Sequence, residues 1–192
     1  MLPARIALVL LLAGGLVCAQ PAPAPKAPDP APSLGQVLDR QLSSLERQLV
    51  PAAEAMPEDK FTFAPTSGEF KGVKTFAQQV GHLGSATYLF AAGIAGEKPP
   101  VDLGLGEDGP DSLKTKADHI KFLKDAFVYA HKAFAGITEA NATASIPTPW
   151  GKGTTTRLGL ATLTAAHGFD HYGQMVIYLR MNGIIPPASR KP

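Results

Sequence analysis

Leucines recur every three or four positions after Ser33, and this spacing predicts a helix with one apolar face. They are Leu34, Leu38, Leu42, Leu45 and Leu49. Because an α-helix turns once in 3.6 residues, side chains at this spacing form one stripe, which is stable only when it packs against another element. Ser33 is a candidate N-cap, and Pro51 and Pro57 bracket the predicted end of the helix.

Three further segments carry apolar residues at helical spacing. They run from about Val73 to Ile94, from about Ser112 to Ala135 and from about Thr156 to Asn182. Gly- and Pro-containing loops separate the four segments, and none shows the alternation typical of a β-strand. We therefore expect an all-α fold, most simply a four-helix bundle, whose long loops permit crossover connections.

Residues 1–19 have the order of a secretory signal peptide. Arg5 precedes an apolar run over residues 6–17 that is too short to span a bilayer, and small residues before Gln20 favour cleavage there. The sequence thus predicts an exported protein, periplasmic or extracellular. The alternatives are a chain anchored in the membrane by an uncleaved signal, or one lipidated at Cys18.

Residues 20–33, QPAPAPKAPDPAPS, are rich in Pro and Ala. Pro has no amide donor and restricts the residue before it, so we expect a disordered linker of extended, polyproline type. The predicted organisation is a signal peptide at 1–19, this linker at 20–33 and a helical domain at 34–189. Cleavage before Gln20 would remove Cys18, the single cysteine of the chain.

Charge and motifs exclude several classes of function. The net charge is only +2 over 192 residues, with no basic run of five or more, which argues against a nucleic-acid partner. The chain also lacks a GxSxG elbow, a Walker loop and a dinucleotide fingerprint. The main candidates for functional side chains are therefore the five histidines.

His167 and His171 lie four residues apart in the predicted helix 156–182. Side chains at i and i+4 leave a helix on the same face and can converge on one metal ion. The spacing alone is a weak signal, because one core histidine and one exposed histidine give the same pattern. His119 and His131 lie twelve residues apart and do not have the spacing of metal ligands. We therefore expect both at surface or boundary positions.

His82 is the third candidate ligand. It lies centrally on a face of small and polar residues in the predicted helix 73–94, although a histidine there could also be a core residue with satisfied hydrogen bonds. Together with His167 and His171 it would give the three-ligand pattern of catalytic zinc, and imidazole also suits nickel and iron. Candidates to orient the ligands or a bound water are Gln78, Ser85, Asp170 and Gln174. Asp170 could equally be a solvated surface charge.

The last predicted helix is apolar on both sides. Phe169, Tyr172 and Val176 lie opposite the histidines. A helix that is apolar on two sides usually packs on two sides. We therefore expect this second surface to be buried, most simply in a homodimer.

Three stretches, taken in order, resemble a DinB/YfiT-like protein. They are FAQQVGHLGSATYLF, DSLKTKADHIKFLKDAFVYAHKAF and HGFDHYGQMVIYLRMNGIIPPAS. The resemblance covers roughly residues 33–189. In the family the last motif often reads HxxxHRGQ, whereas here Tyr172 stands in place of the arginine. The resemblance implies a four-helix bundle, a divalent metal held by His82, His167 and His171, and frequent homodimers.

Characterised relatives in this family include metal-dependent transferases that use low-molecular-weight thiols, and thiol-dependent isomerases. An exported chain would lie outside the compartments that keep such thiols reduced, which argues against simple transfer of that chemistry. We expect a divalent transition metal (zinc, nickel or iron) in a hydrolase or transferase that acts on an unknown small-molecule ligand. The alternatives are a non-catalytic metal- or small-ligand-binding module, or a metal-free bundle that serves interaction.

Overall fold

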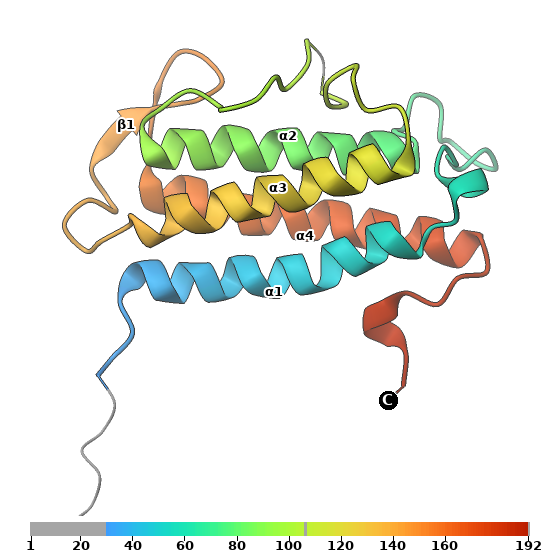
Figure 1. Cartoon of the computed structure of the whole chain (residues 1–192), viewed down its shortest axis with the longest axis horizontal. Coiled ribbons are helices and arrows are strands. Elements are labelled where there is room, and N and C mark those ends of the chain that lie inside the picture. The colour runs from blue at the N-terminus through green and yellow to red at the C-terminus, as the bar shows by residue number, and fades with distance from the viewer. Residues whose placement is uncertain (1–29, 106, 192) are drawn as a thin grey trace, which may run out of the picture. The chain divides into compact units, whose positions relative to one another are not determined.

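The computed structural model describes residues 30–105 and 107–191 (Figure 1). Its elements are α1 (Leu34–Ala55), the 3-10 turn η1 (Glu58–Lys60), α2 (Phe76–Ala95), α3 (Lys116–Ala135), β1 (Ser145–Pro147), β2 (Thr154–Thr156), α4 (Arg157–Met181) and the 3-10 turn η2 (Pro187–Ser189). The predicted signal peptide and residues 20–29 of the predicted linker lie outside the described residues. Within the described residues, no helix is both long and apolar enough to cross a membrane.

The four long helices pack into a bundle (Figure 1). α2 packs against α3 and α4, and α1 packs against the same two helices. α1 and α4 run in one direction while α2 and α3 run in the other, so the connection between α2 and α3 returns along the length of the bundle. The predicted four-helix class is confirmed, and the described residues between α2 and α3 (96–105 and 107–115) belong to a crossover connection of the kind that the long loops permit.

Each helix begins at a side-chain cap. Three capping boxes pair Ser33 with Gln36, Thr75 with Gln78, and Thr115 with Asp118, and Thr156 caps α4. In each box the hydroxyl accepts a backbone N–H at the third helical residue, whose side chain accepts the N–H of the cap. These caps explain why α2 and α3 begin a few residues later than the apolar spacing predicted.

α1 continues beyond Pro51, which the sequence suggested as a boundary. The helix runs on to Ala55. Ala52, Ala53 and Met56 are fully buried, so the last turn extends the apolar stripe into the core. This burial compensates for the backbone hydrogen bond that the proline cannot donate.

A short hairpin between α3 and α4 was not expected. β1 and β2 pair antiparallel, with Ile146 opposite Thr155. Strands of three residues are too short to show an alternating pattern, so the sequence indicated only a loop. The hairpin is part of the connection between the two helices, and Trp150 lies in its turn.

The register between α2 and α4 is fixed along the whole contact. Three hydrogen bonds join the segments, from Arg157 Nε to the Ile94 carbonyl (3.0 Å), from Gln79 Nε2 to Gln174 Oε1 (2.9 Å) and from the Tyr178 hydroxyl to the Lys74 carbonyl (3.0 Å). One lies at each end of the contact and one between them, which shows that the helices are antiparallel. The histidines of the two helices are aligned by the same register.

α4 also approaches α1 closely at Gly168. A Cβ at this position would lie 2.2 Å from Leu45 Cδ2, which is too short for any side chain. The glycine therefore lets the leucine of α1 pack directly against the α4 backbone. This contact fixes α4 at the residue that follows His167.

The predicted surface or boundary position of His119 is wrong. Its side chain is buried, and Nδ1 lies 2.8 Å from the Thr115 carbonyl. Phe61 packs its ring edge-on at a centroid distance of 5.5 Å. The segment after α1 folds over the start of α3 and covers the histidine, a contact that no local pattern in the sequence indicates.

His131 lies at the boundary of the core, as predicted, and links α3 to α1. Nδ1 lies 2.5 Å from Asp39 Oδ1, and Nε2 lies 3.1 Å from Glu46 Oε2. Burial alone would lower the pKa of His131, but the hydrogen bonds and charges of Asp39 and Glu46 outweigh it and raise the pKa above its ordinary value. The protonated ring therefore stabilises the α1–α3 contact.

Replacing His131 should destabilise the bundle in a pH-dependent way. Because the folded-state pKa is raised, the stabilisation is fully present below the unfolded-state value near 6.5 and is lost as pH rises through the folded-state pKa. We expect His131→Asn to cost about 1 kcal/mol in urea unfolding at about pH 5.5 and little at about pH 9. Lys121→Gln, at the exposed pair with Asp125, is the control. An equal cost at both pH values would contradict the assignment.

Candidate metal centre

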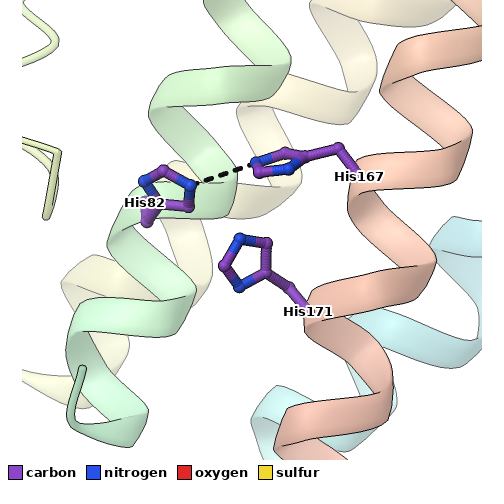
Figure 2. A group of neighbouring side chains, drawn as sticks. All are labelled: His82, His167 and His171. Atoms are coloured by element: carbon purple, nitrogen blue, oxygen red, sulfur yellow. Dashed lines mark hydrogen bonds between the residues drawn. The ribbon is translucent and has the colours of Figure 1, made fainter. Parts of the chain in front are cut away.

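The fold brings the three predicted ligands together. His82 comes from α2, and His167 and His171 come from successive turns of α4 (Figure 2). One ligand nitrogen from each ring lies within 4.8 Å of the other two, and His82 Nε2 lies 3.0 Å from His167 Nε2. Among the described residues, no other group of three potential ligands of this kind lies together. The cluster could hold a metal ion.

A chain of hydrogen bonds determines which nitrogen of His171 carries the proton. Asp170 Oδ2 is a carboxylate oxygen and can only accept, so it receives the Gln174 amide N–H at 3.1 Å. Gln174 Oε1 then accepts from Gln79 Nε2 at 2.9 Å, and the remaining oxygen of Gln79 accepts from His171 Nδ1. Each step leaves one orientation for the next amide. His171 must therefore be protonated at Nδ1, which leaves the Nε2 lone pair free.

The crossover connection orients His82 so that its Nδ1, like that of His171, carries the proton. Its Nδ1 lies 2.5 Å from the backbone carbonyl of Glu107, an acceptor, so Nδ1 carries the proton and donates it. In the neutral His82–His167 pair, the hydrogen bond between the two Nε2 atoms must then be donated by His167. Coordination of a metal through His167 Nε2 would require this proton to move to Nδ1 of the same ring.

Burial keeps the two α4 imidazoles neutral. Desolvation, reinforced by the neighbouring His167 and His82, lowers the pKa of His171 to about 4. Desolvation and then the charge of His82 also lower the pKa of His167, although Asp170 and Glu107 oppose this shift. Both rings therefore keep an unprotonated nitrogen at neutral pH, which is the form that coordinates metals.

The crossover connection is clamped to α2 next to His82. A Cβ at Gly81 would lie 2.2 Å from the Asp108 carbonyl oxygen, so only glycine permits this approach. The Asp108 carboxylate accepts hydrogen bonds from Lys74 and from Gln78 Nε2, the latter at 2.8 Å. The connection thus has a fixed position above His82.

The four residues proposed to support the ligands have different roles. Asp170 and Gln174 belong to the chain that orients His171, as predicted. Ser85 instead donates to a carbonyl of the crossover connection, and Gln78 anchors that connection. Gln79, the direct partner of His171, was not predicted from the sequence. Gln79 precedes His82 by three residues and Gln78 precedes it by four, so helical spacing alone does not distinguish the two amides.

A cavity of about 520 Å³ opens beside two of the three histidines. Its lining residues come from α2, the crossover connection, the hairpin turn and α4, and they are His82, Ser85, Ala86, Leu89, Phe90, Leu103, Gly104, Glu107, Trp150, Leu163 and His167. Trp150, which the sequence analysis did not single out, lies in this wall. Pockets of this size accommodate small organic ligands. The third histidine, His171, lies deeper between the helices and is buried.

The fold and the site together define a helical bundle with three imidazoles presented from two antiparallel helices beside a cavity. The sequence profile of the DinB superfamily matches residues 41–175, and the chain belongs to this family. Two similar solved structures are a DinB-like protein, YjoA, from Bacillus subtilis and a DinB-like protein from Bacillus cereus.

Both solved structures show the same fold at low sequence identity. The B. subtilis protein superposes with a TM-score of 0.61 at 18% identity, covering 81% of this chain and 99% of its own. The B. cereus protein superposes with a TM-score of 0.58 at 18% identity, covering 78% of this chain and 93% of its own. No curated protein matches the sequence significantly.

Removing the acceptor of His171 should loosen that ring. In Gln79→Leu, a substitution of similar volume at a buried position, Nδ1 loses its partner and the Nδ1–H tautomer loses its preference. We expect zinc affinity to fall roughly tenfold, as is typical when the partner of a ligating histidine is lost. Imidazole ¹⁵N shifts report the tautomer, and competition with a fluorescent chelator reports the affinity.

The conservative variant Gln79→Glu retains an acceptor and should preserve the His171 tautomer. Unchanged imidazole shifts and unchanged zinc affinity in Gln79→Leu would show that the hydrogen-bond chain does not control the ring.

Proposed function

We propose that this protein binds one divalent transition metal through the Nε2 atoms of His82, His167 and His171. The observation that carries the proposal is the hydrogen-bond chain from Asp170 to His171, which favours the Nδ1–H tautomer and so leaves the Nε2 lone pair available to a metal. The carbonyl that accepts from His82 Nδ1 supports it from the other helix. Neutral imidazole ligands suit zinc, nickel or iron.

We further propose that the metal serves a hydrolase or transferase reaction on a small molecule. Three protein ligands leave a position for water or substrate, and a metal there acts as a Lewis acid. His82 and His167 line the cavity, so a ligand in it would lie next to that position. The apolar side chains of the lining would hold the ligand and exclude water.

A non-catalytic binding module is the second candidate, and the polar groups of the lining favour it. Besides the histidines, the lining includes the side chains of Ser85 and Glu107. Ser85 already donates to the Leu103 carbonyl, and the Glu107 side chain is 82% exposed. Neither is placed as a general base. Saturable ligand binding by the zinc-loaded protein, without turnover of ester or thiol-transfer substrates, would distinguish this function from an enzyme.

Each of the three histidines should be needed for metal binding. We expect His82→Ala, His167→Ala and His171→Ala to lose at least about tenfold in zinc affinity, while His131→Ala keeps the wild-type value because it lies elsewhere in the bundle. Protons compete for the same lone pairs. Because the pKa values of His167 and His171 are lowered, protons should compete with metal for these two rings only below pH 6.5.

Metal content after purification without a histidine tag, and titration with zinc, nickel and iron, measure these effects. Wild-type protein that takes up none of the three ions, or a His171→Ala variant that binds as tightly as wild type, would refute the site.

Export is proposed on the residues of the N-terminus alone. The order of charge, apolar run and small residues over 1–19 favours cleavage before Gln20 and release to the periplasm or the exterior. N-terminal mass analysis of protein from the native host should begin at or near Gln20. An intact Met1 on soluble cytosolic protein would contradict export, and a lipidated Cys18 would indicate a membrane-anchored protein instead.

We also propose a homodimer through the outer side of α4. Tyr172 and Val176 of the predicted surface are half-buried within the chain, while Phe169 is 39% and Ile177 is 54% exposed. Light scattering should give a dimer for wild type and a monomer for the Phe169→Glu/Ile177→Glu variant, because two charges cannot be buried in that contact. Val128→Glu, on an exposed site of α3, is the control. A monomeric wild type would contradict the proposal.

A further inference from the structure

The cavity beside the histidines has an uneven distribution of charge. Of its described lining residues none is Lys or Arg, and Glu107 supplies the single carboxylate. The remaining non-histidine lining is apolar or small, apart from the Ser85 hydroxyl that already donates to Leu103. In the metal-free protein, an anionic group entering this cavity would lose water without gaining a cationic partner from the lining.

An aromatic row connects the cavity mouth to the histidines. Trp150 is 53% exposed and meets Phe90 edge-on at a centroid distance of 5.8 Å. Phe90 is buried and meets His167 edge-on at 5.9 Å. Leu163, partly exposed on α4, also belongs to the lining. Such a surface attracts flat or branched apolar groups, because these bury area against it without losing hydrogen bonds.

We propose that this cavity is a subsite for an uncharged apolar group, aryl or branched alkyl, of a ligand whose polar end reaches the histidines. Carboxylate-bearing ligands are discriminated against at this end of the site. The position of the polar end at the histidines rests on the proposed metal function. The apolar subsite belongs to side chains of the chain itself and can be tested without metal.

The single tryptophan of the chain makes the subsite directly observable. Trp150 is that tryptophan and lines the cavity, so its fluorescence reports whether a ligand occupies the cavity. The probes are 4-phenylbutanamide and 4-phenylbutanoate, which differ in charge but little in shape. With chelator-treated protein we expect a saturable emission shift for the amide and about tenfold weaker binding of the carboxylate, confirmed by calorimetry.

Variants at Leu163 locate the binding. Leu163→Gln should weaken amide binding about fivefold by replacing apolar lining with a polar group. Leu163 is 37% exposed, so the substitution should leave the fold intact. Val128→Gln, exposed on α3 outside this cavity, should have no effect. Leu163→Lys should narrow or reverse the preference for the amide by supplying the missing cation.

Equal affinity for amide and carboxylate, absence of a saturable shift with either probe, or equal effects of Leu163→Gln and Val128→Gln would overturn the inference. Because these titrations use chelated protein, they are independent of metal binding. Amide binding in a protein that takes up no metal would support the subsite and refute the proposed metal function. Metal uptake without amide binding would support the proposed metal function and refute the subsite.

Discussion

The antiparallel contact between α2 and α4 is the constraint on which the site depends. His82 is on one helix, and His167 and His171 are on the other, so the cluster exists only in one register. One turn of a helix corresponds to about 5.4 Å, which is more than the spread of the three ligand nitrogens. A slip of one turn would therefore disperse them. The hydrogen bonds at Ile94, Gln79 and Lys74 prevent that slip at three separate points.

The middle one of these three hydrogen bonds also involves the side chain that orients His171. The Gln79–Gln174 contact holds the helices in alignment, and the same Gln79 side chain accepts a hydrogen bond from His171 Nδ1. The chain ends at Asp170, which is exposed, so its negative charge remains in water while its effect reaches a buried ring. A buried carboxylate in its place would carry a large desolvation cost. Two neutral amides transmit the orientation without that cost.

Much of this could be predicted from the sequence because the relevant signals are local. Helical spacing predicted all four helices, and the i, i+4 spacing of His167 and His171 predicted a shared face. The small and polar residues on the face of His82 indicated an unusual surface, and in the structure Ser85 and Ala86 of that face line the cavity, where Ser85 donates to the crossover connection. Superposition on DinB-like structures shows the same fold at 18% identity, as expected for a fold set by apolar pattern.

The remaining features depend on contacts between distant segments. Glu107 and Trp150 lie in loops, and nothing in their neighbouring residues indicates that both border the histidine site. His119 was expected at the surface because its helix position is peripheral to the apolar stripe, but Phe61 from another segment covers it. Gln79 was overlooked in favour of Gln78, although both precede His82 by one helical turn. Only the packed helices show which amide faces α4.

The central claim is that three imidazoles, and no other protein groups, coordinate one metal ion. X-ray absorption spectroscopy of the zinc-loaded protein at its zinc edge tests this claim most directly. The account predicts three imidazole nitrogens at about 2.0 Å with one further light-atom ligand, since catalytic zinc sites keep a position open. A spectrum dominated by carboxylate oxygens, or one that contains a single imidazole, would contradict the account.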